Sequence, residues 1–132
     1  MSENLDLVRS IFADWERGDF SSAAWADPEI EFESFGFDAM KTTGVAGMAE
    51  RWRDWMRTWD DYRTEADEYR ELDGRHVLVL MHHGGRGKAS GLGIESMKMP
   101  GANVFEIRDG KVTALALYWN REDALTDLGL EE

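Results

Sequence analysis

Two adjacent histidines, His82 and His83, are the side chains of this sequence best suited to move a proton near neutral pH. They end a largely apolar stretch, His76 to His83, that is predicted to be a strand. Neighbouring side chains of a strand point to opposite faces, so the pair cannot share a metal ion. His76 shares a face with His82, but six residues at about 3.3 Å each separate them by about 20 Å. We therefore expect no metal site. His83 is a candidate acid or base, with a hydrogen-bonded pocket histidine as the alternative.

Carboxylates form a second candidate group. Glu29, Glu31 and Glu33 alternate with Ile30 and Phe32, which predicts a strand over residues 28–34 with one buried face. A solvated strand face explains the three glutamates. Alternatively, Glu33 lies at the strand end near an apolar cavity, where its pKa would rise and make it a base.

Asn103 is a third candidate. It lies two residues before Phe105, so the two side chains should share the inward face of a strand. A buried amide costs stability unless it is hydrogen-bonded, so it needs a partner. That partner would be a pocket residue, a water molecule or a ligand oxygen.

The glycine-rich segment 84–93, GGRGKASGLG, fits no phosphate-binding motif. In a P-loop, Gly87-Lys88 would be followed by Ser or Thr and not by Ala89, and His82 occupies the earlier glycine position. The dinucleotide fingerprint fails at Ser90. We interpret the segment as a flexible or bulged β connection and expect no cofactor. No Ser-His-Asp grouping is evident, so proton transfer in an apolar pocket is the main reaction class left.

The elements that must position these residues end in a hairpin. Phe105 and Ile107 alternate with polar residues, and Asp109-Gly110 is a turn signal. The returning arm, 112–119, is apolar at nearly every position. A strand of this kind has no wet face, so helices or a ligand pocket must cover one side and a partner subunit could cover the other.

Before this hairpin, periodicity predicts helices over residues 3–17, 20–26 and 48–60, and a loop over 34–47. Strands are predicted over 62–72, 76–83 and 94–99, the last ending at Pro100-Gly101, and a final helical turn over 121–128. The order predicts an α+β fold with helices packed on one face of a curved sheet.

Composition limits the function classes. The chain has 132 residues and a formal net charge of −12, which disfavours nucleic acid and anionic membrane surfaces as partners. It has no cysteine, hence no thiolate nucleophile. The first residues lack an apolar signal segment and no apolar run could span a bilayer, so we expect a soluble cytoplasmic protein.

Strand facing then predicts the two sides of the sheet. The pocket wall on the sheet consists of Val79, Met81, His83, Asn103, Phe105, Ile107, Leu115, Leu117 and Trp119, with Trp15, Phe32, Trp55 and Trp59 on the helix side. The outer face carries an apolar patch that we expect to form a homodimer interface: Leu78, Leu80, Ala114, Ala116 and Tyr118.

Three segments resemble the nuclear transport factor 2-like superfamily, in its SnoaL-like, ketosteroid isomerase-like branch. They are RGDFSSAAWADPEIEF, GVAGMAERWRDW and NVFEIRDGKVTALALYWNREDALTDLGL, and the resemblance covers essentially all of residues 1–132 as a single domain. It implies a cone: a curved antiparallel or mixed sheet wrapped on about three N-terminal helices, with an apolar pocket in its opening. It also implies a dimer through the outer face of the sheet.

The resemblance also places functional positions. The steroid isomerase tyrosine falls at Ile11. Its base falls at Glu33 by count or at Ser34 by strand facing, and its second aspartate falls at Asn103, which can still donate a hydrogen bond. The Asp-Arg-Asp set of the related epoxide hydrolases falls at Met81, His83 and Leu117 and is therefore absent.

Three functions remain open. The first is an isomerase-, cyclase- or lyase-like enzyme for a small apolar carbonyl compound, in which Glu33 or His83 moves a proton and Asn103 holds the oxyanion. The second is a non-catalytic binding protein for a lipophilic ligand. The third is a dimeric interaction domain whose pocket is filled by its own side chains.

Overall fold

The computed structural model describes residues 3–17, 19, 24–35, 40–87 and 93–129. These residues form three helices and six strands, and the α+β prediction is confirmed. In chain order the elements are α1 (Glu3–Glu16), β1 (Ala26–Phe35), β2 (Met40–Thr43), α2 (Val45–Thr58), β3 (Trp59–Glu71), β4 (His76–Gly87), β5 (Gly93–Arg108), β6 (Lys111–Tyr118) and α3 (Arg121–Leu128).

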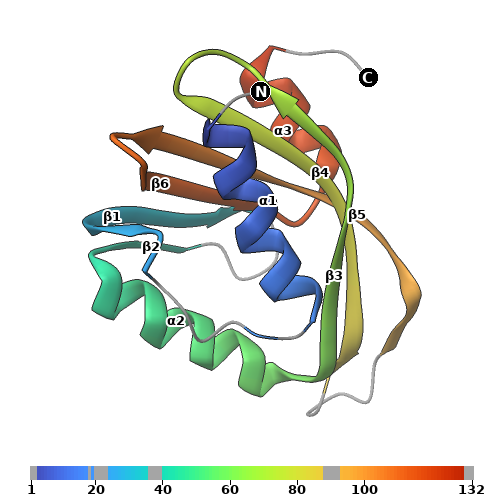
Figure 1. Ribbon diagram of the computed structural model, residues 1–132. Coiled ribbons are helices and arrows are strands. Elements are labelled where there is room, and N and C mark those ends of the chain that lie inside the picture. The colour runs from blue at the N-terminus through green and yellow to red at the C-terminus, as the bar shows by residue number, and fades with distance from the viewer. Residues whose placement is uncertain (1–2, 18, 20–23, 36–39, 88–92, 130–132) are drawn as a thin grey trace.

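The strands form one mixed, strongly curved sheet in the order β2-β1-β6-β5-β4-β3 (Figure 1). Strand β1 runs parallel to β6, and every other neighbouring pair is antiparallel. Helix α1 packs on β3 and β4, while α2 packs on β1, β2 and β3. Both helices lie on one face of the sheet, which we call the concave face. None of the helices in the described ranges is long and apolar enough to cross a membrane.

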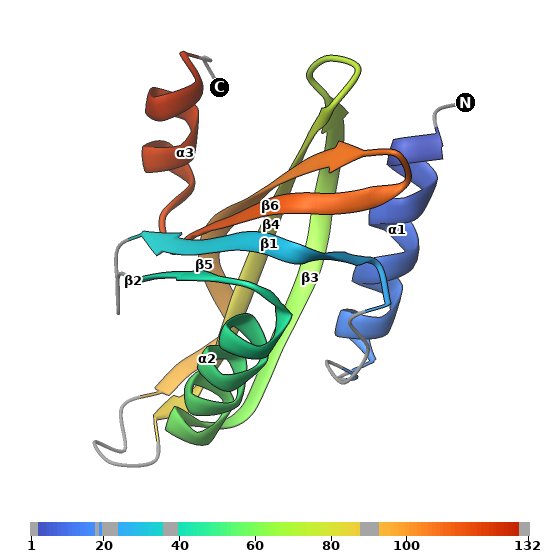
Figure 2. The same ribbon diagram turned by 90° about the vertical axis from the view of Figure 1, so that its left-hand side faces the viewer.

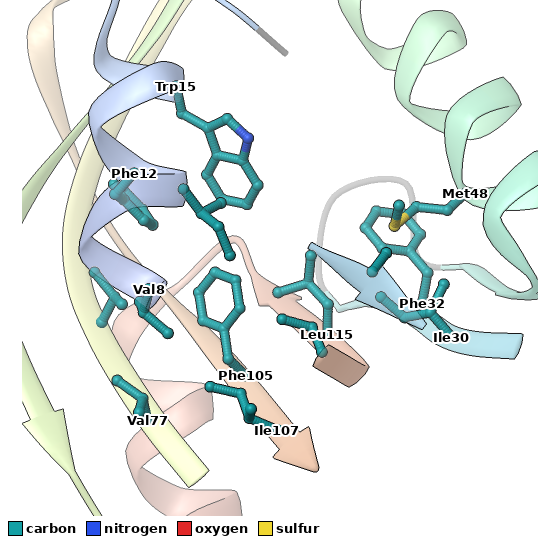
Figure 3. Close-up of a cluster of buried hydrophobic side chains, with 14 of the residues drawn as sticks. Val8, Phe12, Trp15, Ile30, Phe32, Met48, Val77, Phe105, Ile107 and Leu115 are labelled. Atoms are coloured by element: carbon teal, nitrogen blue, oxygen red, sulfur yellow. The ribbon is translucent and has the colours of Figure 1, made fainter. Parts of the chain in front are cut away.

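The main core lies between the concave face and these two helices (Figure 3). Val8, Ile11, Phe12 and Trp15 recur at helical spacing, so α1 presents them together to the sheet. Alternate strand residues meet them from below, because side chains of a strand alternate between its faces. Those contributed by the strands include Ile30, Phe32, Val77, Val79, Met81, Phe105, Ile107, Val112 and Leu115.

A bulge near the start of β6 brings two of its apolar residues to the same face. Ala114 pairs with Glu106 and Val112 pairs with Ile107, so Thr113 is an extra residue. Its hydroxyl donates to the Glu106 carbonyl at 3.2 Å. The extra residue shifts the alternation, so Val112 and Leu115 both belong to the concave core.

The opposite, convex face is covered by α3, which lies across the sheet from α1 (Figure 2). Leu78 and Leu80 are buried there beneath Ala124 and Leu125. Tyr118 is also buried, and its hydroxyl donates to Asp127 Oδ2 at 3.1 Å. The patch that we expected to meet a second subunit is therefore largely covered by the chain's own last helix.

Four sequence predictions need correction. The helix expected over 20–26 falls partly outside the described residues, and β1 already begins at Ala26. The loop expected over 34–47 contains β2, which pairs with β1. In the described residues two helices, and not about three, are N-terminal, while α3 lies where the sequence predicted a final helical turn over 121–128. Finally, β5 runs through Pro100-Gly101 without a break. Strand β5 pairs with β6 only from Ala102 onward. Among the residues that the structure describes, Pro100 therefore has no neighbouring strand on that side, and its missing N–H interrupts no ladder of backbone hydrogen bonds.

Candidate functional site

Three polar side chains are buried among the described residues, and all three lie on the concave face. They are Thr64 on β3, His83 on β4 and Asn103 on β5, each 3–4% exposed. Thr64 pairs directly with His83 across the two strands. Met81 lies two residues before His83, and Phe105 lies two residues after Asn103. Both belong to the concave core, so His83 and Asn103 also face the concave side. A buried polar side chain in an apolar sheet needs either a partner or a function.

His83 is held at the point where β6 ends. Its Nε2 lies 3.3 Å from the carbonyl oxygen of Trp119, and its ring meets the Trp119 ring edge-on at 4.5 Å between centroids. A carbonyl only accepts, so Nε2 carries the proton. In the neutral imidazole Nδ1 is then the acceptor nitrogen. The geometry thus selects one tautomer of His83.

Gly101 makes this position possible. It pairs with Met81 on β4, and the imidazole of His83 crosses above it. A Cβ at Gly101 would lie 2.9 Å from the Tyr118 carbonyl oxygen, 3.0 Å from His83 Nε2 and 3.0 Å from Met81 Sδ. The 2.9 Å approach to a backbone oxygen is closer than real Cβ atoms come, so the imidazole can lie here only because residue 101 has no side chain.

Burial keeps His83 neutral. Loss of hydration lowers the pKa of its imidazole from 6.5 to about 4, and the nearby His82 lowers it further, although the hydrogen bond to Trp119 opposes the shift. At neutral pH His83 is therefore an uncharged imidazole that can accept a proton or a hydrogen bond.

Asn103 lies on the same face but is not next to this histidine, because its partner on β4, Val79, comes four residues before His83. It pairs with Val79 on β4 and Leu117 on β6, so apolar side chains flank it on both sides. Its inward facing, predicted from Phe105, is confirmed by the register. The amide offers two donors and an acceptor to anything that approaches the centre of the concave face.

Thr64 adds a hydroxyl that the sequence did not single out. Its Oγ1 is buried and has no hydrogen-bond partner in the described part of the chain. Leaving such a group unsatisfied costs about 1–3 kcal/mol. A threonine in a predicted strand is ordinary, so only the pairing with His83 reveals it.

Glu33 does not reach this site. It pairs with Ala116 on β6 and Lys41 on β2, and it acts electrostatically on Tyr118 of the convex face. Ser34 pairs with Leu117 and shares the concave face with Asn103. The choice between the two residues is decided by register: Ser34 faces inward and Glu33 faces outward.

Most of the expected pocket wall is packed core. The Trp15 ring lies 5.0 Å from Trp52 and 5.9 Å from Phe105, and Phe32 lies 5.5 Å from Trp52, measured between ring centroids. Leu117 and Trp119 are only half-buried. The side chains of Trp55 and Trp59 lie outside the described residues. The buried members of the predicted wall are Trp15, Phe32, Val79, Met81, His83, Asn103, Phe105, Ile107 and Leu115.

Metal ligation finds no support in the described ranges, where no group of three or more histidine, aspartate or glutamate side chains could hold an ion. His76 and His82 are each bound to an aspartate instead. His76 Nδ1 lies 3.0 Å from both carboxylate oxygens of Asp73, and His82 Nδ1 lies 2.7 Å from Asp67 Oδ1. Among the described residues, the concave face offers an imidazole, an amide and hydroxyl groups that include those of Ser34 and Thr64.

Solved structures share the fold over most of their length. A protein of unknown function with a cystatin-like fold from Xanthomonas campestris is 19% identical, with a TM-score of 0.75 over 92% of this chain and 100% of that one. A candidate SnoaL-like polyketide cyclase from Jannaschia sp. CCS1 is 13% identical, with a TM-score of 0.73 over 87% and 83%. A hypothetical protein with a ketosteroid isomerase-like fold from Catenulispora acidiphila, in complex with trimethylamine, is 15% identical, with a TM-score of 0.72 over 96% and 94%.

No curated protein sequence matches the chain. The SnoaL-like domain profile matches residues 8–115, from the first helix to the last strand. This range includes Thr64, His83 and Asn103. The chain belongs to the SnoaL-like domain family.

Proposed function

We propose that the protein binds a small, mostly apolar carbonyl compound against the concave face and that His83 accepts a proton from it. The observation that carries the proposal is the fixed tautomer of His83, with Nε2 on the Trp119 carbonyl and Nδ1 as acceptor. A buried, neutral imidazole among apolar side chains suits proton abstraction next to a carbonyl. The surrounding aromatic side chains suit a ligand of the same character.

The proposed reaction moves one proton between the ligand and His83. The carbon next to the carbonyl gives its proton to Nδ1, and the electron pair of that C–H bond forms an enolate. The amide of Asn103 donates to the enolate oxygen, where the charge develops. His83 then returns the proton to a carbon of the enolate system, which isomerises the ligand and restores the neutral imidazole. In D2O the proton on Nδ1 is first replaced by a deuteron from the solvent, so the carbon receives deuterium and the ligand is exchanged.

A second candidate is binding without chemistry. It is favoured by the pKa of His83 near 4, because a general base works best when its pKa lies close to the working pH. In this case His83 and Asn103 would only hydrogen-bond to the ligand. A homodimer and a cytoplasmic location likewise remain predictions.

Hydrogen–deuterium exchange separates the two candidates. We expect the protein to accelerate exchange of the α-hydrogens of 2-tetralone in D2O, followed by proton NMR. Glutamine can still donate from its amide to Trp119 but cannot take up a proton, so His83→Gln should lower the catalysed rate by about 100-fold or more. His76→Gln, at the first residue of β4, is the matched control and should exchange normally. Binding of 2-tetralone without exchange would exclude the catalytic proposal and support the second.

A further inference from the structure

A charged network on the convex face contacts the backbone that supports His83 from below. Arg121, the first residue of α3, donates to the Met81 carbonyl at 2.8 Å and lies 3.4 Å from the Gly101 carbonyl. It also donates to Asp67 Oδ2 at 2.8 Å. The other oxygen of Asp67 bonds to His82 at 2.7 Å. One guanidinium thus joins strands β3, β4 and β5 to α3.

The two carbonyls belong to the strand positions that set the imidazole of His83. Met81 and Gly101 face each other across β4 and β5. Gly101 supplies the space under the His83 ring, and Met81 precedes His83 by two residues on the same face. A change in the spacing of β4 and β5 at this pair would therefore move the imidazole relative to Trp119.

Trp119, whose carbonyl accepts the hydrogen bond from His83, lies two residues before Arg121. Trp119, Asn120 and Arg121 are consecutive, and Asn120 caps α3 by accepting from the Glu122 amide at 2.8 Å. Arg121 therefore fixes the segment that carries the Trp119 carbonyl. It holds both sides of the His83–Trp119 hydrogen bond, the strands beneath the ring and the carbonyl beside it.

The charged side chains of this network are partly shielded from solvent, which strengthens the interactions between them. The side chains of Arg121, His82 and Asp67 are 21%, 28% and 38% exposed, whereas those of the Arg17–Asp14 pair at the end of α1 are 64% and 38% exposed. Arginine also has the planar fork needed to bind a carboxylate and a carbonyl at once. Lysine would keep the charge and lose this geometry.

We propose that Arg121 is a positioning residue that acts through the sheet on His83, with Asp67 as its anchor. The inference rests on the proposed function only where it concerns the exchange reaction, because the position of the imidazole can be measured without a substrate. It assigns to the convex face and α3 a part in the chemistry of the opposite face.

The experiment is nitrogen-15 NMR of histidine-labelled protein, read as the tautomer and titration midpoint of His83 in four variants. In Arg121→Met the imidazole loses its fixed place, so its pKa should rise by about one unit towards that of an exposed histidine. The Nε2–H tautomer should lose its dominance, and 2-tetralone exchange should fall about tenfold or more. Arg70→Met is the matched control, because Arg70 pairs with Glu68 on the convex face of β3 and contacts neither carbonyl.

Two further variants separate position from charge. Arg121→Lys keeps the charge but not the fork, so it should behave like Arg121→Met. Asp67→Asn removes a negative charge, and this change in charge alone would lower the pKa of His83. If Asp67 acts by anchoring Arg121, the imidazole instead loses its fixed place and its pKa should rise. Both variants also test the proposal if Arg121→Met does not fold.

The outcomes are distinct. An unchanged His83 tautomer and titration in folded Arg121→Met, a wild-type His83 in Arg121→Lys, or a lowered pKa in Asp67→Asn would each overturn the inference. If His83 shifts as expected but the unaltered protein exchanges no 2-tetralone, the inference stands and the proposed function fails. If the unaltered protein catalyses exchange but His83 does not move in the variants, the proposed function stands and the inference fails.

Discussion

His83 gives the protein a pH dependence of stability with a defined sign. Its pKa is about 4 when folded and 6.5 as the reference for the unfolded chain, so the unfolded state binds the proton more readily. The stabilisation is complete above pH 6.5 and is lost as pH falls from 6.5 to 4, by roughly 3 kcal/mol over the window. Urea unfolding from pH 4 to 7 should therefore show a flatter profile for His83→Gln than for the unaltered protein. Carboxylates titrate in both proteins, so parallel profiles would contradict a buried neutral imidazole.

The hydroxyl of Thr64 makes a second prediction at the scale of one residue. It is buried without a partner in the described part of the chain, so Thr64→Val removes an unsatisfied group and keeps the shape. We expect the free energy of unfolding to rise by about 1 kcal/mol. Thr43→Val, at an exposed position of β2, is the control and should change stability by less than about 0.5 kcal/mol. A loss of stability in Thr64→Val would mean that the hydroxyl is satisfied by a bound water.

At the scale of elements, α3 is a structural part of the sheet and not an appendage. It begins at the Asn120 cap, ends at Gly129 in the left-handed conformation, and buries Leu125 against the convex face. Leu125→Ala should lower the free energy of unfolding by about 2–4 kcal/mol, because it leaves a cavity between helix and sheet. The exposed neighbour Thr126 provides the control Thr126→Ala. Equal, small losses in both variants would show that α3 is not docked in solution.

Helix α3 also covers part of the face through which a dimer could form. Leu78, Leu80 and Tyr118 are buried within one chain, so they cannot be the exposed patch of an interface. Ala114 remains half-buried on the convex face, opposite Glu31 and Glu106. If a homodimer uses the rest of this face, light scattering should give twice the 15.1 kDa chain mass. Ala114→Arg should then give a folded monomer, because the two glutamates accept the new charge. A monomer in the unaltered protein at micromolar concentration would end the dimer prediction.

The sequence alone determined the type of most elements and the facing of their residues. The spacing of Val8, Phe12 and Trp15 predicted a helix with one buried side, and Asp109-Gly110 predicted the hairpin turn. Alternation placed His83, Asn103 and Phe105 inward, as the register confirms. These features depend on the period of a helix or strand, which is a local property that side chains reveal without knowledge of their neighbours.

How those elements combine depends on contacts between distant parts of the chain. The parallel pairing of β1 with β6 turns Ser34 and not Glu33 towards Asn103, and a register one residue different would reverse that choice. Helix α3 packs on the convex face, for which the sequence had allowed a second subunit as the cover. The contacts of His83 with Trp119, Gly101 and Thr64 join residues up to 36 positions apart. Such contacts follow from strand order, bulges and the paths of connections, and these are set by the packing of the whole chain and not by any local pattern.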